Sequence, residues 1–105
     1  MNTQFKKGVL ELCALTLLLK EDRYGYELAD VLGKKMTVSE GSVYPMLKRL
    51  QSDGYFETYL KESPNGPARK YYRITNSGRY RQSILLKQWS EFENQVNSFF
   101  EEVSI

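Results

Sequence analysis

The hydrophobic pattern of this 105-residue chain changes its period twice, and the two changes limit the folds that the chain can adopt. Up to residue 54, and again after residue 75, apolar residues recur every three or four positions, as on one face of an α-helix. Between these points they alternate with polar residues, as in a half-buried β-strand. The sequence therefore predicts a mainly α fold with a small β-hairpin before the last helix.

Three helices are predicted ahead of the hairpin. The first runs from Phe5 to Lys20, where apolar residues are too dense to leave a broad polar face. The second begins near residue 24 and ends near Gly33, because glycine is a typical C-terminal stop. The third follows Ser39, a favourable N-cap, and stops at Gly54, where a left-handed residue belongs.

The hairpin is predicted from strands at residues 55–62 and 70–74, joined by a tip at residues 63–68. The tip holds two of the three prolines and an Asn-Gly pair, which favour a turn and exclude a helix. The alternation along the two strands gives the side chains that are expected to face the core, namely Phe56, Leu60, Tyr72 and Ile74.

A last helix is predicted after Thr75, a second favourable N-cap. Six apolar residues along it recur at spacings of four and three, which is a heptad seam and narrower than a core-facing stripe. At ~1.5 Å per residue the seam is about 27 Å long, too long for a core of this size to cover. We therefore expect it to pack on a second copy of the chain, giving a homodimer. The seam residues are Leu85, Trp89, Phe92, Val96, Phe99 and Val103.

The composition excludes most catalytic and metal sites. With one cysteine and no histidine, the chain cannot form a disulfide of its own, a Cys/His zinc site or a Ser-His-Asp triad. We expect no enzymatic activity, no cofactor and no metal. The longest apolar run, Leu12 to Leu19, is shorter than the roughly 20 residues that span a bilayer, and no secretory signal is evident. The expected location is the cytoplasm, without a membrane partner.

Charge is distributed unevenly along the chain. Residues 1–87 carry all 15 Lys and Arg against nine acidic residues, a net +6, whereas residues 88–105 carry four glutamates and no cation, a net −4. The densest basic stretch, from Lys61 to Lys87, is interleaved with tyrosines. Such a combination indicates a polyanionic partner, although a basic run can also be a simple solvated face.

Three segments carry a resemblance to a known family. They are YGYEL at residues 24–28, SEGSVYPMLKRLQSDG at residues 39–54 and RKYYRITNSG at residues 69–78. Together they resemble the PadR family of bacterial transcription regulators, in the small subgroup that has one C-terminal helix. The resemblance implies a winged helix-turn-helix DNA-binding domain over residues 1–74, followed by a dimerisation helix over residues 75–105. It also implies a homodimeric repressor that binds an inverted repeat of double-stranded DNA.

The DNA contacts are expected from three places. The N-terminal part of the third helix would enter the major groove, the hairpin tip and its second strand would hold the minor groove or phosphates, and Tyr24 would donate its hydroxyl to a phosphate. The expected DNA-binding residues are Tyr24, Ser39, Ser42, Tyr44, Lys48, Arg49, Asn65, Gly66, Arg69 and Lys70.

Trp89 has two interpretations. It can simply fill the dimer seam together with Phe92. By resemblance to small PadR-like regulators, it can also pair with the partner's tryptophan around a flat aromatic effector that Gln88 helps to orient, since a large aromatic face stacks well on such a ligand. A ligand of this kind would release the repressor only by favouring one spacing of the recognition helices.

A second class of function also fits the pattern. The same winged helix could dock a protein partner without binding nucleic acid. The basic hairpin and the Lys48-Arg49 pair argue against this alternative. Salt would separate the two, because phosphate binding weakens steeply with ionic strength and an apolar protein interface does not.

Overall fold

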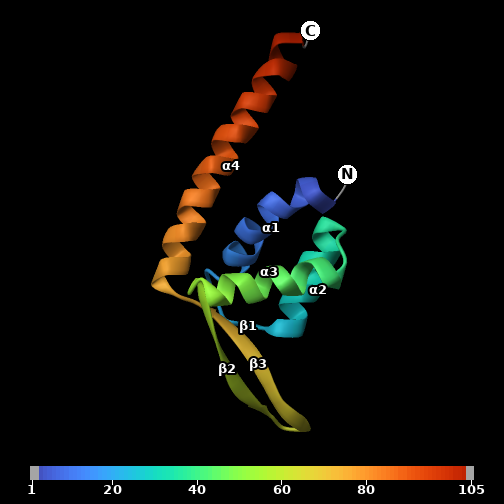
Figure 1. The fold of residues 1–105 in the computed structure, drawn as a ribbon, viewed down its shortest axis with the longest axis vertical. Helices are drawn as coiled ribbons and strands as arrows, with labels where there is room; N and C mark the ends of the chain where they lie inside the picture. Colours follow the sequence, from blue (N-terminus) through green and yellow to red (C-terminus); the bar gives the residue numbers. More distant parts are fainter. Residues whose placement is uncertain (1–2, 104–105) are drawn as a thin grey trace.

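The chain folds as three helices, a hairpin and one long helix, so the predicted fold class is confirmed (Figure 1). The computed structural model describes residues 3–103. The elements are α1 (Thr3–Leu17), β1 (Arg23–Tyr24), α2 (Gly25–Met36), α3 (Glu40–Ser52), β2 (Phe56–Ser63), β3 (Gly66–Ile74) and α4 (Asn76–Val103). No helix within this range is long and apolar enough to cross a membrane.

The core lies where α1, α2 and α3 meet the inner face of the sheet. Leu15 of α1, Leu28 of α2 and Leu47 of α3 are all fully buried in it. Burial of each such leucine contributes about 1.5–3 kcal/mol relative to exposure. The core therefore fixes the positions of α1, α2 and α3 relative to one another.

The predicted end of the second helix at Gly33 is wrong, because α2 continues for one more turn to Met36. Thr37 takes the left-handed position instead, with φ of 55°. The carbonyl groups at this end find partners: the backbone N–H of Val38 donates to Gly33 O (3.0 Å) and Lys6 Nζ donates to Met36 O (2.6 Å). These bonds satisfy carbonyl groups at the helix end without a glycine in the left-handed position, so the helix can continue through Gly33.

The sheet has a third strand that the sequence pattern does not reveal. The order is β1-β3-β2, and β3 pairs antiparallel with both neighbours. Strand β1 contains only two residues, which is too short to produce a visible alternation. It connects the end of α1 to the hairpin.

The inward positions of the hairpin are confirmed for Phe56, Tyr72 and Ile74 but not for Leu60. Leu60 pairs with Lys70, beyond the region that the helices cover, and its side chain is 72% exposed. The alternation identified its face of the sheet correctly. It could not show that the hairpin extends past the core (Figure 1).

The start of α4 is docked tightly on the end of α3. Gly54 has the expected left-handed φ of 81°, and Thr75 caps α4 by accepting a hydrogen bond from Gly78 N (3.0 Å). The same Thr75 hydroxyl donates to Gly54 O (2.6 Å), while its backbone N–H donates to Tyr55 O (3.1 Å). Gly78 itself lies against the Tyr55 carbonyl, where a Cβ would overlap the oxygen. This junction joins the last two helices.

Beyond its first turns, α4 leaves the core. The molecule measures 59 × 27 × 21 Å, and its long axis is set by α4, whose C-terminal half stands clear of the other helices (Figure 1). Phe92, Phe99 and Phe100 are exposed there.

Gly78→Ala should lower the free energy of unfolding by about 3 kcal/mol, because the added methyl group would push α4 off the Tyr55 carbonyl. Urea unfolding at equal protein concentration measures the change. Gly66→Ala is the matched control, since a Cβ at Gly66 would meet open space and should change stability by less than about 0.5 kcal/mol. Equal midpoints for the two variants would contradict the tight junction.

Candidate nucleic-acid interface

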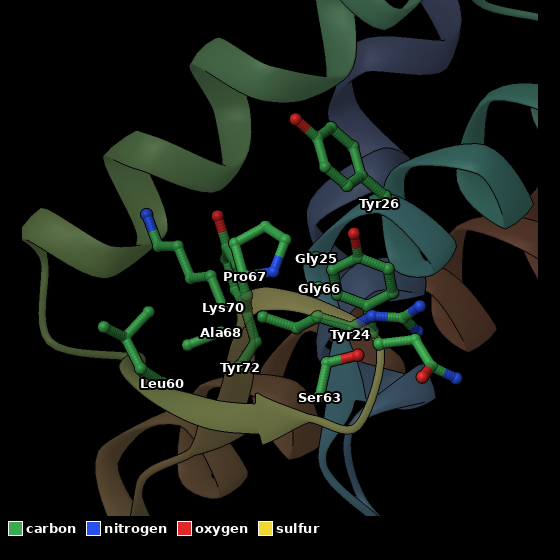
Figure 2. A pocket seen from close by; sticks show the side chains of 12 residues that line it. Tyr24, Gly25, Tyr26, Leu60, Ser63, Gly66, Pro67, Ala68, Lys70 and Tyr72 are labelled. Atoms are coloured by element: carbon green, nitrogen blue, oxygen red, sulfur yellow. The ribbon is translucent and has the colours of Figure 1, made fainter.

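A groove of about 510 Å³ lies between the inner face of the hairpin and the start of α2. Figure 2 shows the tyrosines on the β1–α2 side and the hairpin residues forming the opposite wall. Gly25 allows this close approach, because its Cα lies next to the Tyr72 ring and the Lys70 carbonyl. The groove brings together five of the residues that were expected to contact DNA, namely Tyr24, Asn65, Gly66, Arg69 and Lys70.

The outer face of the sheet carries three tyrosines in a row, which we call the tyrosine ladder: Tyr24, Tyr71 and Tyr59. The register places Tyr71 of β3 opposite both of the others. Its ring centroid lies 5.9 Å from that of Tyr24 and 5.8 Å from that of Tyr59, with the rings nearly parallel. Offset stacking of this kind adds to the cross-strand pairing. The ladder therefore ties all three strands together at the base of the hairpin.

Cations cover the tyrosine ladder. The Arg69 guanidinium lies 4.9 Å from the centre of the Tyr24 ring, and Lys61 Nζ lies 5.0 Å from that of Tyr71. Lys61 and Arg69 are also direct cross-strand partners. Two like charges in this position destabilise a sheet unless an anion lies near them. Lys61, which begins the basic stretch but was not among the expected DNA contacts, is thus a further interface candidate, and the hairpin register is the signal that places it beside Arg69.

Many cations of the interface lack an acidic partner. Within residues 3–103, no carboxylate lies within ion-pairing distance of the following side chains of α3 and the hairpin: Lys48, Lys61, Arg69 and Lys70. Arg73 differs, since its guanidinium is 3.2 Å from Asp22 and 3.7 Å from Glu57. The uncompensated positive charge is therefore concentrated toward the hairpin tip and away from its base.

Asp22 anchors the base of the hairpin to the segment that follows α1. Its Oδ2 accepts hydrogen bonds from Tyr59 Oη (2.6 Å) and from Arg73 Nε (3.2 Å). The hydrogen bond to Asp22, together with partial desolvation, raises the pKa of Tyr59. The attraction of the Asp22 charge likewise raises the pKa of Arg73. The direction of the hairpin is therefore fixed by polar contacts in addition to the sheet.

The predicted contacts of the third helix lie outside the groove. Ser39 and Ser42 at its start have their hydroxyls 3.3 Å apart, and Lys48 is exposed one turn beyond Tyr44. Tyr44 is half-buried against the core, and desolvation, with a smaller effect of the Glu40 charge, raises its pKa.

Arg49 stands apart from these residues. Its Nη2 lies 3.8 Å from the carboxylate of Glu11 on α1, so its charge is partly compensated within the fold while half of its side chain stays exposed. Sequence adjacency to Lys48 could not reveal this, because neighbouring residues of a helix point in directions about 100° apart.

The predicted effector residues lie on the projecting part of α4. The Trp89 and Phe92 rings are 6.3 Å apart and tilted at 45°, and both are partly open to solvent, as is Gln88. A separate apolar groove of about 570 Å³ lies between α1, α2 and the first half of α4. Cys13 and Leu17 of α1, Val31 of α2 and Leu86 of α4 line it.

Comparison with known proteins assigns the fold to a family. A family model described as the transcriptional regulator PadR-like family matches residues 14–83, which include α2, α3, the whole sheet and the first turns of α4. The chain belongs to the PadR family. PadR-family proteins are DNA-binding transcriptional regulators and are not enzymes. The predicted family and the DNA-binding regulatory class are thereby confirmed, and the alternative of a protein-interaction module without DNA binding is not supported.

Individual relatives align with nearly the whole length of this PadR-family protein. A PadR-like transcriptional regulator from Bacillus cereus is 42% identical, with 93% of this chain and 97% of that chain covered and a TM-score of 0.82. A PadR family transcription regulator from Clostridium difficile is 30% identical, with 88% and 98% covered and a TM-score of 0.77. An uncharacterised protein of Lysinibacillus sphaericus is 33% identical over 99 residues, covering 90% of this chain and 91% of its own.

Asp22→Ala should return the pKa of Tyr59 toward the ordinary tyrosine value, because the hydrogen bond that raises it is lost. Since the folded-state pKa is the higher one, this bond stabilises the wild-type fold below about pH 10 and is lost as the pH rises through the folded pKa. NMR of the tyrosine ring carbons, assigned with Tyr59→Phe, measures the titration. In the control Asp30→Ala, which breaks a distant surface pair with Lys34, Tyr59 should titrate as in wild type.

Proposed function

We propose that this PadR-family chain is a homodimeric repressor that binds an inverted-repeat operator through the groove, the hairpin tip and the start of α3. The observation that carries the proposal is the set of uncompensated cations gathered beside the groove and along the hairpin. Like charges held close together without acidic partners repel one another and destabilise the unbound protein. They favour binding of DNA, because DNA carries a negative charge on every phosphate.

A backbone phosphate of DNA would enter the groove beside the start of α2. No side-chain cap is formed on this helix, which begins after Tyr24, and Gly25 and Tyr26 of its first turn line the groove. The positive end of the helix dipole adds to the charges of Arg69 and Lys70. Tyr24 would donate its hydroxyl to the same strand. These contacts position the protein on the duplex without reading its sequence.

Sequence would be read by the start of α3. Ser39 and Ser42 present hydroxyls that can serve either a donor or an acceptor on a base edge, and Lys48 can reach guanine or a phosphate. Tyr44 supports this end of the helix from the side of the core. Arg49 would contribute less to phosphate binding than Lys48, because its guanidinium lies 3.8 Å from Glu11.

The hairpin tip would enter the adjacent minor groove. Asn65 lies in the turn between β2 and β3, and Gly66, which has no side chain, is the first residue of β3. Lys61 on the outer face could then reach the second strand of the duplex while Lys70 holds the first. The hairpin would thus be held between two phosphate backbones.

A second copy of the chain would cover the apolar surface of α4. Of the six expected seam residues, Leu85 instead packs partly buried against the core of its own chain. Trp89, Phe92, Phe99 and Val103 are exposed and Val96 is half-buried, and the groove lined by Cys13 and Leu86 lies beside the start of this seam. Charge is complementary: the C-terminal half of α4 carries only acidic charges, whereas Lys35 borders the groove. A twofold dimer would place the two α3 helices about one duplex turn, ~34 Å, apart.

A flat aromatic effector would be held at this dimer interface. Trp89 and Phe92 are open in the single chain, so their rings are available to the partner or to a ligand between the subunits. Gln88 would offer the polar contact. Such a ligand would release the operator only if it binds one spacing of the two α3 helices better than the other.

The double variant Arg69→Ala/Lys70→Ala should weaken binding to the DNA upstream of the protein's own gene by about tenfold or more and reduce the log-log salt slope by about 1.8, because two phosphate contacts are lost. Electrophoretic shifts over a salt series measure both quantities. Lys34→Ala, which removes a cation paired with Asp30 elsewhere on the surface, is the control and should bind as wild type. Equal binding by wild type and the double variant at every salt concentration would show that the hairpin assignment is wrong.

Phe92→Glu should make the chain monomeric at micromolar protein concentration, where wild type is expected to be a dimer. The substitution places a charge in the seam beside Glu91 and Glu93. Sedimentation measures the state, and Asn94→Glu adds the same charge off the seam as a control. A wild-type chain that sediments as a monomer would contradict the proposed dimer.

Flat aromatic compounds should quench Trp89 fluorescence in wild type but not in Phe92→Glu. An unchanged wild-type spectrum over a broad panel of such compounds would show that Trp89 only packs in the seam.

A further inference from the structure

Glu11 of α1 contacts both α3, the proposed DNA-reading helix, and α4, the proposed dimerisation helix. Its Oε1 accepts a hydrogen bond from Arg81 Nε of α4 at 3.1 Å. Its Oε2 lies 3.8 Å from Arg49 Nη2 of α3. One carboxylate therefore lies between the helix that would read DNA and the helix that would form the dimer.

The Glu11 carboxylate is held in a partly desolvated place. Its side chain is 14% exposed, and the hydrogen bond to it raises the pKa of Arg81 although burial opposes that change. The Arg81 guanidinium also lies 5.8 Å from the ring centre of Tyr55, the residue that follows the α3 turn. The Arg81–Glu11 pair, at 3.1 Å, is screened less than an exposed pair, whereas the Arg49 side chain is 50% exposed and its 3.8 Å pair with Glu11 is the weaker of the two. Loss of the carboxylate leaves both guanidinium groups uncompensated.

Other contacts also connect α4 to the rest of the fold. The chain junction docks Thr75 on Gly54, and Gln82 Nε2 of α4 donates to Thr16 Oγ1 of α1 at 3.2 Å. Glu11 differs from these, because its one carboxylate faces a guanidinium of α3 and a guanidinium of α4. It therefore restricts the angle between the two helices at a point away from the chain junction.

We propose that Glu11 is a positioning residue that fixes the angle between α3 and α4 and thereby sets the half-site spacing that the regulator accepts. The inference rests on the proposed dimer. In a twofold pair, each α4 is held by its partner and each α3 follows its own α4. A looser angle would let the two α3 helices reach several spacings with similar affinity.

A merely structural role for Glu11 would give a different result. General destabilisation would lower the amount of folded protein and weaken binding to all DNA duplexes by the same factor. Loss of the angle would instead change the ratio of affinities between duplexes that differ only in spacing. The ratio is therefore the decisive quantity.

The test compares full-length wild type, Glu11→Gln and Arg81→Gln, with Asp30→Asn as a control that breaks a surface pair on α2. Spin labels on cysteines introduced at Ser52 and Asn97, in a Cys13→Ala background and diluted with unlabelled chain, report the distance between α3 and α4 within one chain. We expect a single narrow distance in wild type and the control, and a broader distribution in both test variants. Urea midpoints confirm that each variant is folded.

The same proteins are then titrated with inverted repeats whose spacers differ by single base pairs. We expect the preference of wild type for its best spacer over the next to fall by about fivefold or more in Glu11→Gln, with half-site affinity unchanged within about twofold. Unchanged label distances in folded Glu11→Gln would overturn the proposal, and so would an unchanged spacer ratio. Wild type that binds none of the duplexes would overturn the proposed function instead, and the label distances would still decide the role of Glu11.

Discussion

The position of β3 between two other strands is the constraint on which the DNA-binding surface depends. Because β3 is hydrogen-bonded on both edges, its register is fixed twice, once by β1 and once by β2. That register turns Tyr72 and Ile74 toward the core and Arg69 and Tyr71 away from it. A slip by one residue would exchange the two faces and turn Arg73 toward the core in place of Tyr72 or Ile74. The short strand β1 therefore has an effect out of proportion to its length.

Much of this arrangement can be predicted from the sequence because it depends on local patterns. The helical period, the Asn-Gly tip and the Thr75 cap act over a few residues, and the family motifs then identify the class of protein. The features that were missed depend on residues far apart in the chain. Arg49 pairs with Glu11, 38 positions away, and Leu60 is exposed because no helix extends over it. Periodicity gives the face of an element but not what covers that face.

Acidic partners separate the cations that hold the fold together from those proposed to bind DNA. Arg73 and Arg81 are held by Asp22 and Glu11, and each of these carboxylates connects elements that lie far apart in the sequence. The cations toward the hairpin tip have no such partners in the described part of the chain. The same residue types thus serve two purposes, and the distance to a carboxylate, which sequence does not show, tells them apart.

The projecting half of α4 gives the proposed dimer a consequence for the lifetime of the chain. In a lone copy this segment has almost no tertiary packing within residues 3–103, and an isolated helix of such length is marginal in water. It would fray and expose an apolar end, which is the kind of segment that proteases cut first. If the chain pairs as proposed, unassembled copies would then be cleared faster than paired ones, and the cell would retain mainly the dimeric form.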